Sequence, residues 1–356
     1  MNRFVGLVLM LMMAQVASWA EMLVYVSVSG EKRIAIFRLD EKTGGLEAAG
    51  SLDVDGAPGP IWEHPNRPKF FAALRSGGKL ATLDVDRATG MLSVGHLTMP
   101  GESSPFVLPD PSGRYLLSAY YGAGKVMVHS IAADGALSAE PLQVIDTAKN
   151  AHCIRLDPSG RFGFVPHTGP NAVYQFRWDG EAGRLTANDP PTATGTPEGA
   201  GPRHIYFHPA LPVAYTANEM GSSVTVYGFD SSSGTLTAVQ TLPTLPADFS
   251  EKNTCADVEA TADGRFVYVS NRGHDSIAAF RVDGKSGRLE AAGWYPTEAT
   301  PRSFNIDPSG RYMVAAGQGS GKLATFRRDA VSGALERLGT YEVGRSPAWV
   351  MIVDRP

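Results

Sequence analysis

Short runs of apolar, β-branched and aromatic residues recur along almost the whole chain. Stretches such as "FFAALRSGGKLATLDVD" and "FVYVSNRGHDSIAAFRVD" place two such runs around a turn rich in glycine, serine or asparagine. Two short hydrophobic runs on either side of a turn of this composition predict a β-hairpin. With 39 glycines and 25 prolines to supply turns, we expect an all-β chain.

One unit of this pattern repeats. The spacing from Asp110 to Asp157 is 47 residues and the spacing from Ala262 to Asp307 is 45. Each unit contains a Pro/Asp-Gly turn and predicts four short strands, and this combination is typical of a β-propeller blade. The clearer copies begin at Asp110 ("DPSGRYLLSAYYGAGKVMVHSI"), Asp157, Ala262 and Asp307, and the looser ones at His64 and His208.

The blade count follows from the two ends of the chain. Six units have a first strand of their own, whereas "EMLVYVSVSG" at residue 21 begins at a second strand. The segment "RSPAWVMIVD", residues 345–354, resembles a first strand with no blade after it. We therefore predict one domain over residues 21–356, a seven-bladed β-propeller of four-stranded blades, closed by pairing of the C-terminal strand with the N-terminal blade. Closure removes an exposed sheet edge.

Residues 1–20 have the pattern of a cleavable secretory signal. Arg3 precedes an apolar run, and Ser18 and Ala20 form a small-x-small ending. The run is shorter than the roughly 20 residues of a membrane span, so we expect a periplasmic or secreted protein without a membrane anchor. The net charge of −4 and the lack of a Lys/Arg block disfavour nucleic acid as a partner. We expect a monomer.

The repeat also predicts where a site would form. In a propeller the first strand of each blade lines the central channel, so its start and the hairpin between the second and third strands lie on one face. At the start of the first strands the blades carry Gly59, Pro105, His152, Arg203, Ala256, Arg302 and Pro347. At the hairpins they carry Ser29, Arg75, Tyr121, Thr168, Glu219, Arg272 and Gln318. Residues that served packing alone would be alike in every blade, so these varied polar residues predict a site at the channel mouth.

The residue types at this mouth indicate an anionic small molecule. Guanidinium groups match carboxylate or phosphate, a histidine held by a carboxylate can take a proton from water, and a guanidinium stabilises an oxyanion. The catalytic candidates are His152, Glu219, Arg203 and Arg272. The candidates for substrate binding are Arg302, Asp257, Tyr121, Gln318 and His204.

Simpler interpretations apply to several of these residues. Arg203 and Arg272 flank Glu219 and can be plain ion-pair partners. Because adjacent strand residues point to opposite sides, we expect Arg203 to face the channel and its neighbour His204 to pack between blades, behind the site. We expect Arg75 to be a solvated surface charge. The arginines of the repeated "SGR" turns are expected to be structural, namely Arg114, Arg161 and Arg311.

No cofactor is expected. The chain has no nucleophile-elbow pattern, no His-x-x-x-His and no cysteine cluster, which disfavours covalent serine catalysis and zinc. The two cysteines, Cys153 and Cys255, begin different repeats, and we expect no disulfide between them. Oxygen ligands for calcium are conceivable, and that option stays open. They are Asn218, Glu219, Asp257 and Asn271.

The segments "EGAGPRHIYFHP", "TANEMGSSVTVY" and "PTEATPRSFNIDPSGRYMVAAGQ" resemble the seven-bladed propeller lactonases. That family includes the propeller-type bacterial 6-phosphogluconolactonase and, more distantly, the fungal carboxymuconate cyclase. The resemblance covers nearly all of residues 21–356. It implies an active site of His, Arg, Glu and Arg, which correspond here to His152, Arg203, Glu219 and Arg272.

The resemblance implies metal-independent hydrolysis of a sugar-acid lactone, with 6-phospho-D-glucono-1,5-lactone as the substrate of the best-known members. His152 would activate water, and Glu219 would orient it or share that role. We take 6-phospho-D-glucono-1,5-lactone, opened to 6-phosphogluconate, as the predicted substrate. Phosphorylated sugars are scarce outside the cytoplasm, so the export signal keeps another acidic lactone open. Two alternatives stay open: a non-catalytic exported propeller that binds an anionic ligand or a protein, and a cycloisomerase of the muconate type.

Overall fold

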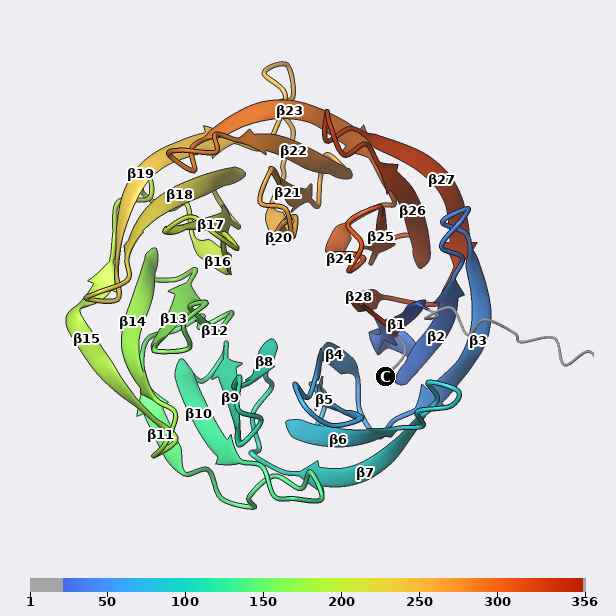
Figure 1. The fold of residues 1–356 in the computed structure, drawn as a ribbon, viewed down its shortest axis with the longest axis vertical. Coiled ribbons are helices and arrows are strands. Elements are labelled where there is room, and N and C mark those ends of the chain that lie inside the picture. The colour runs from blue at the N-terminus through green and yellow to red at the C-terminus, as the bar shows by residue number, and fades with distance from the viewer. Residues whose placement is uncertain (1–21, 355–356) are drawn as a thin grey trace, which may run out of the picture.

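Seven four-stranded antiparallel sheets form a ring around a central channel (Figure 1). The computed structural model describes residues 22–354, so the predicted signal sequence over residues 1–20 lies outside the described residues. Within residues 22–354 the sole helical element is the three-residue 3-10 turn Ser29–Glu31. That part of the chain contains no helix long and apolar enough to cross a membrane. The predicted fold, a seven-bladed β-propeller, is confirmed.

Each blade runs from an innermost strand at the channel to an outermost strand at the rim of the ring. Blade 1 contains, in that order, β28 (Pro347–Asp354), β1 (Met22–Val28), β2 (Arg33–Leu39) and β3 (Leu46–Asp53). Blade 2 contains β4 (Pro58–Glu63), β5 (Lys69–Leu74), β6 (Lys79–Val85) and β7 (Leu92–Thr98). Blade 3 contains β8 (Phe106–Pro109), β9 (Tyr115–Tyr120), β10 (Lys125–Ser130) and β11 (Gln143–Asp146). Blade 4 contains β12 (Arg155–Leu156), β13 (Phe162–His167), β14 (Ala172–Asp179) and β15 (Arg184–Ala193). Blade 5 contains β16 (Pro202–Phe207), β17 (Val213–Asn218), β18 (Ser223–Asp230) and β19 (Thr235–Pro243). Blade 6 contains β20 (Cys255–Ala260), β21 (Phe266–Asn271), β22 (Ser276–Val282) and β23 (Leu289–Pro296). Blade 7 contains β24 (Pro301–Ile306), β25 (Tyr312–Gly317), β26 (Lys322–Arg328) and β27 (Leu335–Glu342).

The ring closes in blade 1, as the sequence predicts. The last strand, β28, pairs antiparallel with β1, from Met22 opposite Asp354 to Val28 opposite Pro347. The other edge of β1 pairs with β2. Both ends of the described chain are therefore held in one sheet, and the backbone groups of β1 are paired on both sides.

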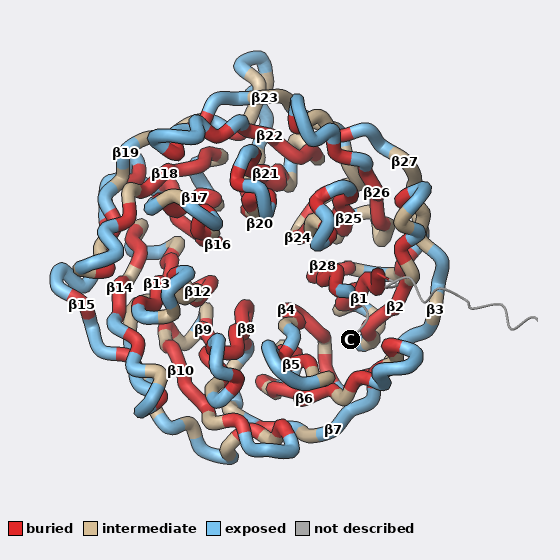
Figure 2. Tube along the Cα trace, viewed as in Figure 1, coloured by how far each residue is buried: buried red, intermediate tan, exposed pale blue. Residues whose placement is uncertain are grey.

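The core lies between the blades. All seven residues of β1 are buried, as are all six of β13, β17, β21 and β25. The outermost strands, such as β7 and β23, are largely exposed (Figure 2). A blade has a neighbour on each face, so its second strand is covered on both sides and is rich in apolar residues.

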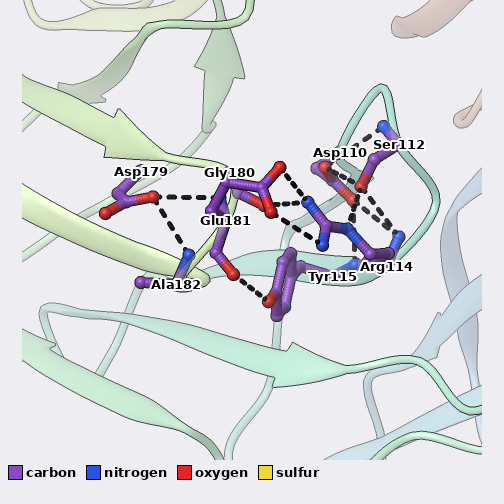
Figure 3. Close-up of polar contacts among 8 residues, drawn as sticks. All are labelled: Asp110, Ser112, Arg114, Tyr115, Asp179, Gly180, Glu181 and Ala182. Atoms are coloured by element: carbon purple, nitrogen blue, oxygen red, sulfur yellow. Dashed lines mark hydrogen bonds and ion pairs between the residues drawn. The ribbon is translucent and has the colours of Figure 1, made fainter.

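Asp-Pro-Ser-Gly-Arg turns begin at Asp110, Asp157 and Asp307 and tie their blades to a neighbouring blade. Figure 3 shows the turn at Asp110. The carboxylate of Asp110 accepts hydrogen bonds from the hydroxyl of Ser112 at 2.6 Å and from the backbone N–H of Tyr115 at 2.8 Å. Gly113, with a φ of 70°, takes the left-handed conformation that such a turn requires. Arg114 then forms an ion pair with Glu181 of blade 4 at 2.9 Å.

Two further arginines of this motif bond to an adjacent blade in the same way. Arg161 Nη2 donates to the carbonyl oxygen of Ser231 at 2.7 Å, and Arg311 lies 3.6 Å from Glu41. The structural interpretation of the "SGR" arginines therefore agrees with their contacts. These turns join the first and second strands of a blade, at the end of the channel opposite the predicted mouth.

Candidate active site

The starts of the innermost strands enclose a small cavity at the mouth of the channel. Its walls come from β4, β8, β16, β24, β28 and the β5–β6 hairpin. The polar and aromatic side chains that line it are Arg75, Arg203, His204, Arg302 and Trp349. Three of these are sequence-predicted site residues, namely Arg203, His204 and Arg302.

Glu219 is held by two arginines. Arg272 Nη2 donates a hydrogen bond to Oε1 of Glu219 at 2.5 Å, and Arg203 Nε lies 3.8 Å from the same oxygen. Burial alone would raise the pKa of Glu219, but Arg203 and Arg272 outweigh it and lower the pKa below the ordinary value. The carboxylate is therefore ionised at neutral pH, and the ion pairing that the sequence allows is present.

Arg203 and His204 line the same cavity, so the expectation that they point to opposite sides is wrong. The expectation that His204 packs between blades agrees with its contact to Asp257 of blade 6. The alternation rule fails because β16 is bulged there. Pro202 pairs with Asn218 and His204 with Ala217, which leaves Arg203 as the extra residue. A one-residue bulge re-aims the adjacent side chain, and here it turns two consecutive residues toward the channel.

His204 connects Arg203 to a buried carboxylate. Its Nδ1 lies 2.7 Å from Oδ1 of Asp257, and its Nε2 lies 3.2 Å from Nη1 of Arg203. A guanidinium nitrogen can only donate, so Nε2 must accept and the proton of His204 must sit on Nδ1, which donates to Asp257. Burial, reinforced by the charge of Arg203, lowers the pKa of His204 to about 4. His204 is therefore neutral at pH 7.

This chain of contacts fixes the guanidinium of Arg203. Its Nη1 donates to the carbonyl oxygen of Ala256 at 2.5 Å as well as to His204. Only 2% of Arg203 is exposed. Burial would raise the pKa of Asp257, but His204 and then Arg203 lower it, so Asp257 is ionised. Asp257 and His204 together set the direction of an arginine that is almost fully enclosed.

His152 lies in the segment that leads into β12, with its ring 5.1 Å from the ring of His204 and 5.5 Å from that of Tyr121. Its Nδ1 is buried without a hydrogen-bond partner. Burial, followed by the charge of Arg203, holds the pKa of His152 well below its usual value, so the ring is neutral. No carboxylate of the described residues forms an ion pair with His152. The histidine held by a carboxylate is instead His204.

Arg302 and Arg75 add positive charge to the mouth. Within residues 22–354 no hydrogen bond or ion pair reaches the Arg302 side chain, and burial together with Arg203 and Arg75 holds its pKa well below the usual value. Arg75 Nε donates to the hydroxyl of Ser103 at 3.3 Å, and burial lowers its pKa. The expectation that Arg75 is a solvated surface charge is wrong. Arg75 occupies the hairpin position equivalent to Glu219 and Arg272. This shared position in the repeat could have predicted that Arg75 lies at the mouth.

Two further candidates differ in outcome. Tyr121 contacts the His152 ring edge-on and accepts a hydrogen bond from the Thr168 hydroxyl at 3.3 Å. Gln318 lines a separate surface depression beside Glu342 and Arg345, so the structure does not bring it to the central cavity. Trp349, which has no counterpart among the sequence candidates, forms part of the cavity wall.

The possible calcium ligands do not assemble into a site. The Asn218 amide donates to the hydroxyls of Ser223 and Thr225, at 2.9 and 2.8 Å, and Asn271 bonds to Thr244. Across residues 22–354 no group of three or more His, Cys, Asp or Glu side chains is placed to hold a metal ion. Cys153 and Cys255 are buried free thiols, in agreement with the expectation of no disulfide.

With this geometry established, comparison with known proteins decides the family. Residues 23–352 match the model of the family described as "Lactonase, 7-bladed beta-propeller". The chain belongs to this lactonase family. The enzyme class that the sequence implied, a lactone hydrolase, is thereby confirmed.

Relatives of this lactonase match along nearly their whole length. A 6-phosphogluconolactonase of Pectobacterium carotovorum is 34% identical over 333 residues, which cover 94% of this chain and 99% of that protein. One of Serratia proteamaculans is also 34% identical, covering 93% and 98%. Among solved structures, a periplasmic gluconolactonase of Pseudomonas aeruginosa superposes with a TM-score of 0.87 at 29% identity, covering 94% and 99%.

Proposed function

We propose that this lactonase hydrolyses a negatively charged sugar-acid lactone, with 6-phospho-D-glucono-1,5-lactone as the first substrate to test, and that the reaction needs no metal ion. The observation that carries the proposal is the charge of the mouth. Four arginines face one glutamate there, and Arg302 has no acceptor among the described residues. Arginine forks of this kind bind phosphate or carboxylate.

In the proposed reaction, neutral His152 takes a proton from water as the water oxygen bonds to the lactone carbonyl carbon. The carbonyl oxygen becomes an oxyanion beside Arg203 and Arg272. The ring C–O bond then breaks, the ring oxygen takes the proton from His152, and the open-chain acid leaves. General-base help of this kind contributes about 10²- to 10⁴-fold.

The other residues position these groups. Glu219 has a lowered pKa and bonds to arginines, so we assign it to aligning Arg203 and Arg272 rather than to taking the proton. Asp257, through His204, holds Arg203 in place. Arg302 and Arg75 would bind the anionic group of the substrate.

The export signal favours a second candidate substrate. We propose that residues 1–20 direct the protein out of the cytoplasm, where phosphorylated sugars are scarce. The Pseudomonas aeruginosa relative in this family is a periplasmic gluconolactonase. The unphosphorylated D-glucono-1,5-lactone, which carries no charge, is therefore the second substrate to test, and a preference for it would contradict the proposal of a negatively charged substrate.

The test compares kcat/KM for the two lactones, after subtraction of spontaneous opening, in wild type, Arg302→Gln and the control Arg87→Gln. Arg87 is an exposed arginine in the turn after β6. Loss of one charged hydrogen bond is worth about 1.5–3 kcal/mol, or roughly 10- to 150-fold. We expect Arg302→Gln to lose that factor on the phosphorylated lactone and little on the other, and Arg87→Gln to lose nothing. Equal losses on both lactones would contradict the anion-binding role.

Two further measurements address the chemistry. His152→Gln is expected to bind the product acid as wild type does and to lose about 10²- to 10⁴-fold in kcat. An unchanged kcat would remove His152 from catalysis, and turnover lost together with binding would leave only a binding role. Dialysis against EDTA should leave the rate unchanged, and a loss restored by a divalent cation would refute metal independence.

A further inference from the structure

The channel contains a second cavity, at the end opposite the mouth. Its volume is about 210 Å³, against the roughly 10–15 Å³ that one buried water requires. Glu63, the last residue of β4 before the turn to β5, marks its outer rim. Trp349 lines both cavities, and the His204–Asp257 pair spans them, since His204 faces the mouth and Asp257 faces the second cavity. Trp349 and the His204–Asp257 pair therefore lie between the two cavities.

A guanidinium without hydrogen-bond acceptors lines this cavity. The Arg155 guanidinium stacks on aromatic rings, 4.4 Å from the ring centre of Trp62, 5.3 Å from that of Tyr206 and 5.4 Å from that of Phe106. Its Nε is buried without a partner, and none of the described residues accepts a hydrogen bond from it. A guanidinium carries five N–H donors. Those of Arg155 therefore need acceptors that the folded chain does not provide.

The charge of this compartment differs from that of the arginine-rich mouth. Glu63, Asp257 and Glu259 line it against the single positive charge of Arg155. Asp257 is ionised and offsets the charge of Arg155, whereas burial, followed by repulsion from Asp354, raises the pKa of Glu63. The compartment therefore has no surplus positive charge to attract an anion. Arg155 already lies over the Trp62 ring, and its charge would repel a second cation, which leaves a neutral molecule as the best match.

The remaining polar groups both donate and accept. Glu259 accepts hydrogen bonds from the amide of Asn305 at 2.8 Å and from the backbone N–H of Ile306 at 3.1 Å. Burial and the neighbouring Asp257 raise the pKa of Glu259 to about 8, so its carboxyl group keeps a proton at pH 7 and can donate as well. A wall of donors, acceptors and aromatic rings suits adjacent hydroxyl groups on a carbon ring.

We propose that the second cavity binds one neutral polyhydroxylated molecule, of the size of a single sugar ring, whose hydroxyl groups bond to Arg155 and Glu259. Its carbon face lies against the aromatic wall that includes Trp62. This site is distinct from the arginine-lined mouth and does not depend on the reaction proposed there.

The test is isothermal titration calorimetry with D-glucose and D-gluconate, two probes of similar size that differ in charge. The proteins are wild type, Arg155→Met, Trp62→Leu and, as the control at the mouth, Arg302→Gln. We expect saturable binding of D-glucose, about tenfold weaker in Arg155→Met, in line with the loss of one or two hydrogen bonds. Trp62→Leu should also weaken it, and Arg302→Gln should not.

Three results would overturn the proposal. The first is no saturable binding of D-glucose to wild type. The second is tighter binding of D-gluconate that is lost in Arg155→Met, which would make the cavity a carboxylate site. The third is equal loss of D-glucose binding in Arg302→Gln, which would place the sugar at the mouth. Thermal melting checks the fold of each variant, and if Arg155→Met does not fold, Trp62→Leu carries the comparison.

Discussion

Asp257→Asn tests how the fold positions the arginine nearest the reaction. The carboxylate of Asp257 accepts the Nδ1 proton of His204, which leaves Nε2 free to accept from Arg203. An asparagine at 257 has nearly the same shape but can turn its amide N–H toward Nδ1. The proton of His204 would then move to Nε2, where it would face the N–H of Arg203, and two donors repel.

The magnitude follows from the contact that is lost. A hydrogen bond to a charged group is worth about 1.5–3 kcal/mol, and each 1.36 kcal/mol of barrier is tenfold in rate. We therefore expect kcat/KM to fall about 10- to 150-fold in Asp257→Asn. Because Arg203 is assigned to the oxyanion, most of the loss should appear in kcat rather than in KM.

The assay is lactone opening followed in a pH-stat, with the spontaneous rate subtracted. Glu181→Gln is the matched control, since it removes a carboxylate from an exposed ion pair with Arg114 on the far face (Figure 3). It should keep the wild-type rate. His204→Gln should cost about as much as Asp257→Asn, and the double variant no more than either one, because both act through the same contact.

Two outcomes would refute this reasoning. Wild-type kcat in Asp257→Asn would show that His204 does not hold Arg203. Fully additive losses in the double variant would show that Asp257 and His204 act independently. In the first case, a lower melting temperature would make the pair purely structural.

Three further predictions concern the fold. Both ring nitrogens of buried His129 lack partners, and burial lowers its pKa to about 4. The unfolded chain binds that proton below pH 6.5, so stability is lost as the pH falls, by about 3 kcal/mol at pH 4. His129→Phe should remove this loss in urea titrations at pH 7 and pH 4, and an unchanged difference would contradict it. Burial raises the pKa of Cys153 and Cys255 to about 12, so a thiol reagent should modify neither until the protein is denatured. Deletion of residues 347–356 should abolish cooperative unfolding by circular dichroism, because β1 loses its channel-side partner.

The ring was predictable because the repeat is a local property. Turn residues and hydrophobic runs recur with each blade, and the lone first strand at residues 345–354 has to pair with the lone second strand at residue 22. The channel-facing registers were predictable for the same reason. They pointed to Arg203 and Arg302, both in the cavity wall, but also to Gln318, which lies in another depression.

Contacts between blades could not be obtained from the repeat. Composition, period and the ends of the chain were enough for seven blades and an arginine-rich mouth, since the repeat places equivalent positions of every blade at the same end of the channel. The bulge at Arg203 lies within blade 5, in the pairing of β16 with β17. The half-buried position of Arg75 and the tautomer of His204 depend on side chains from other blades. Those side chains are about 50 residues apart in sequence and meet only in the closed ring. Packing across the channel, which a strand pattern does not encode, therefore determines which polar groups of this lactonase act together.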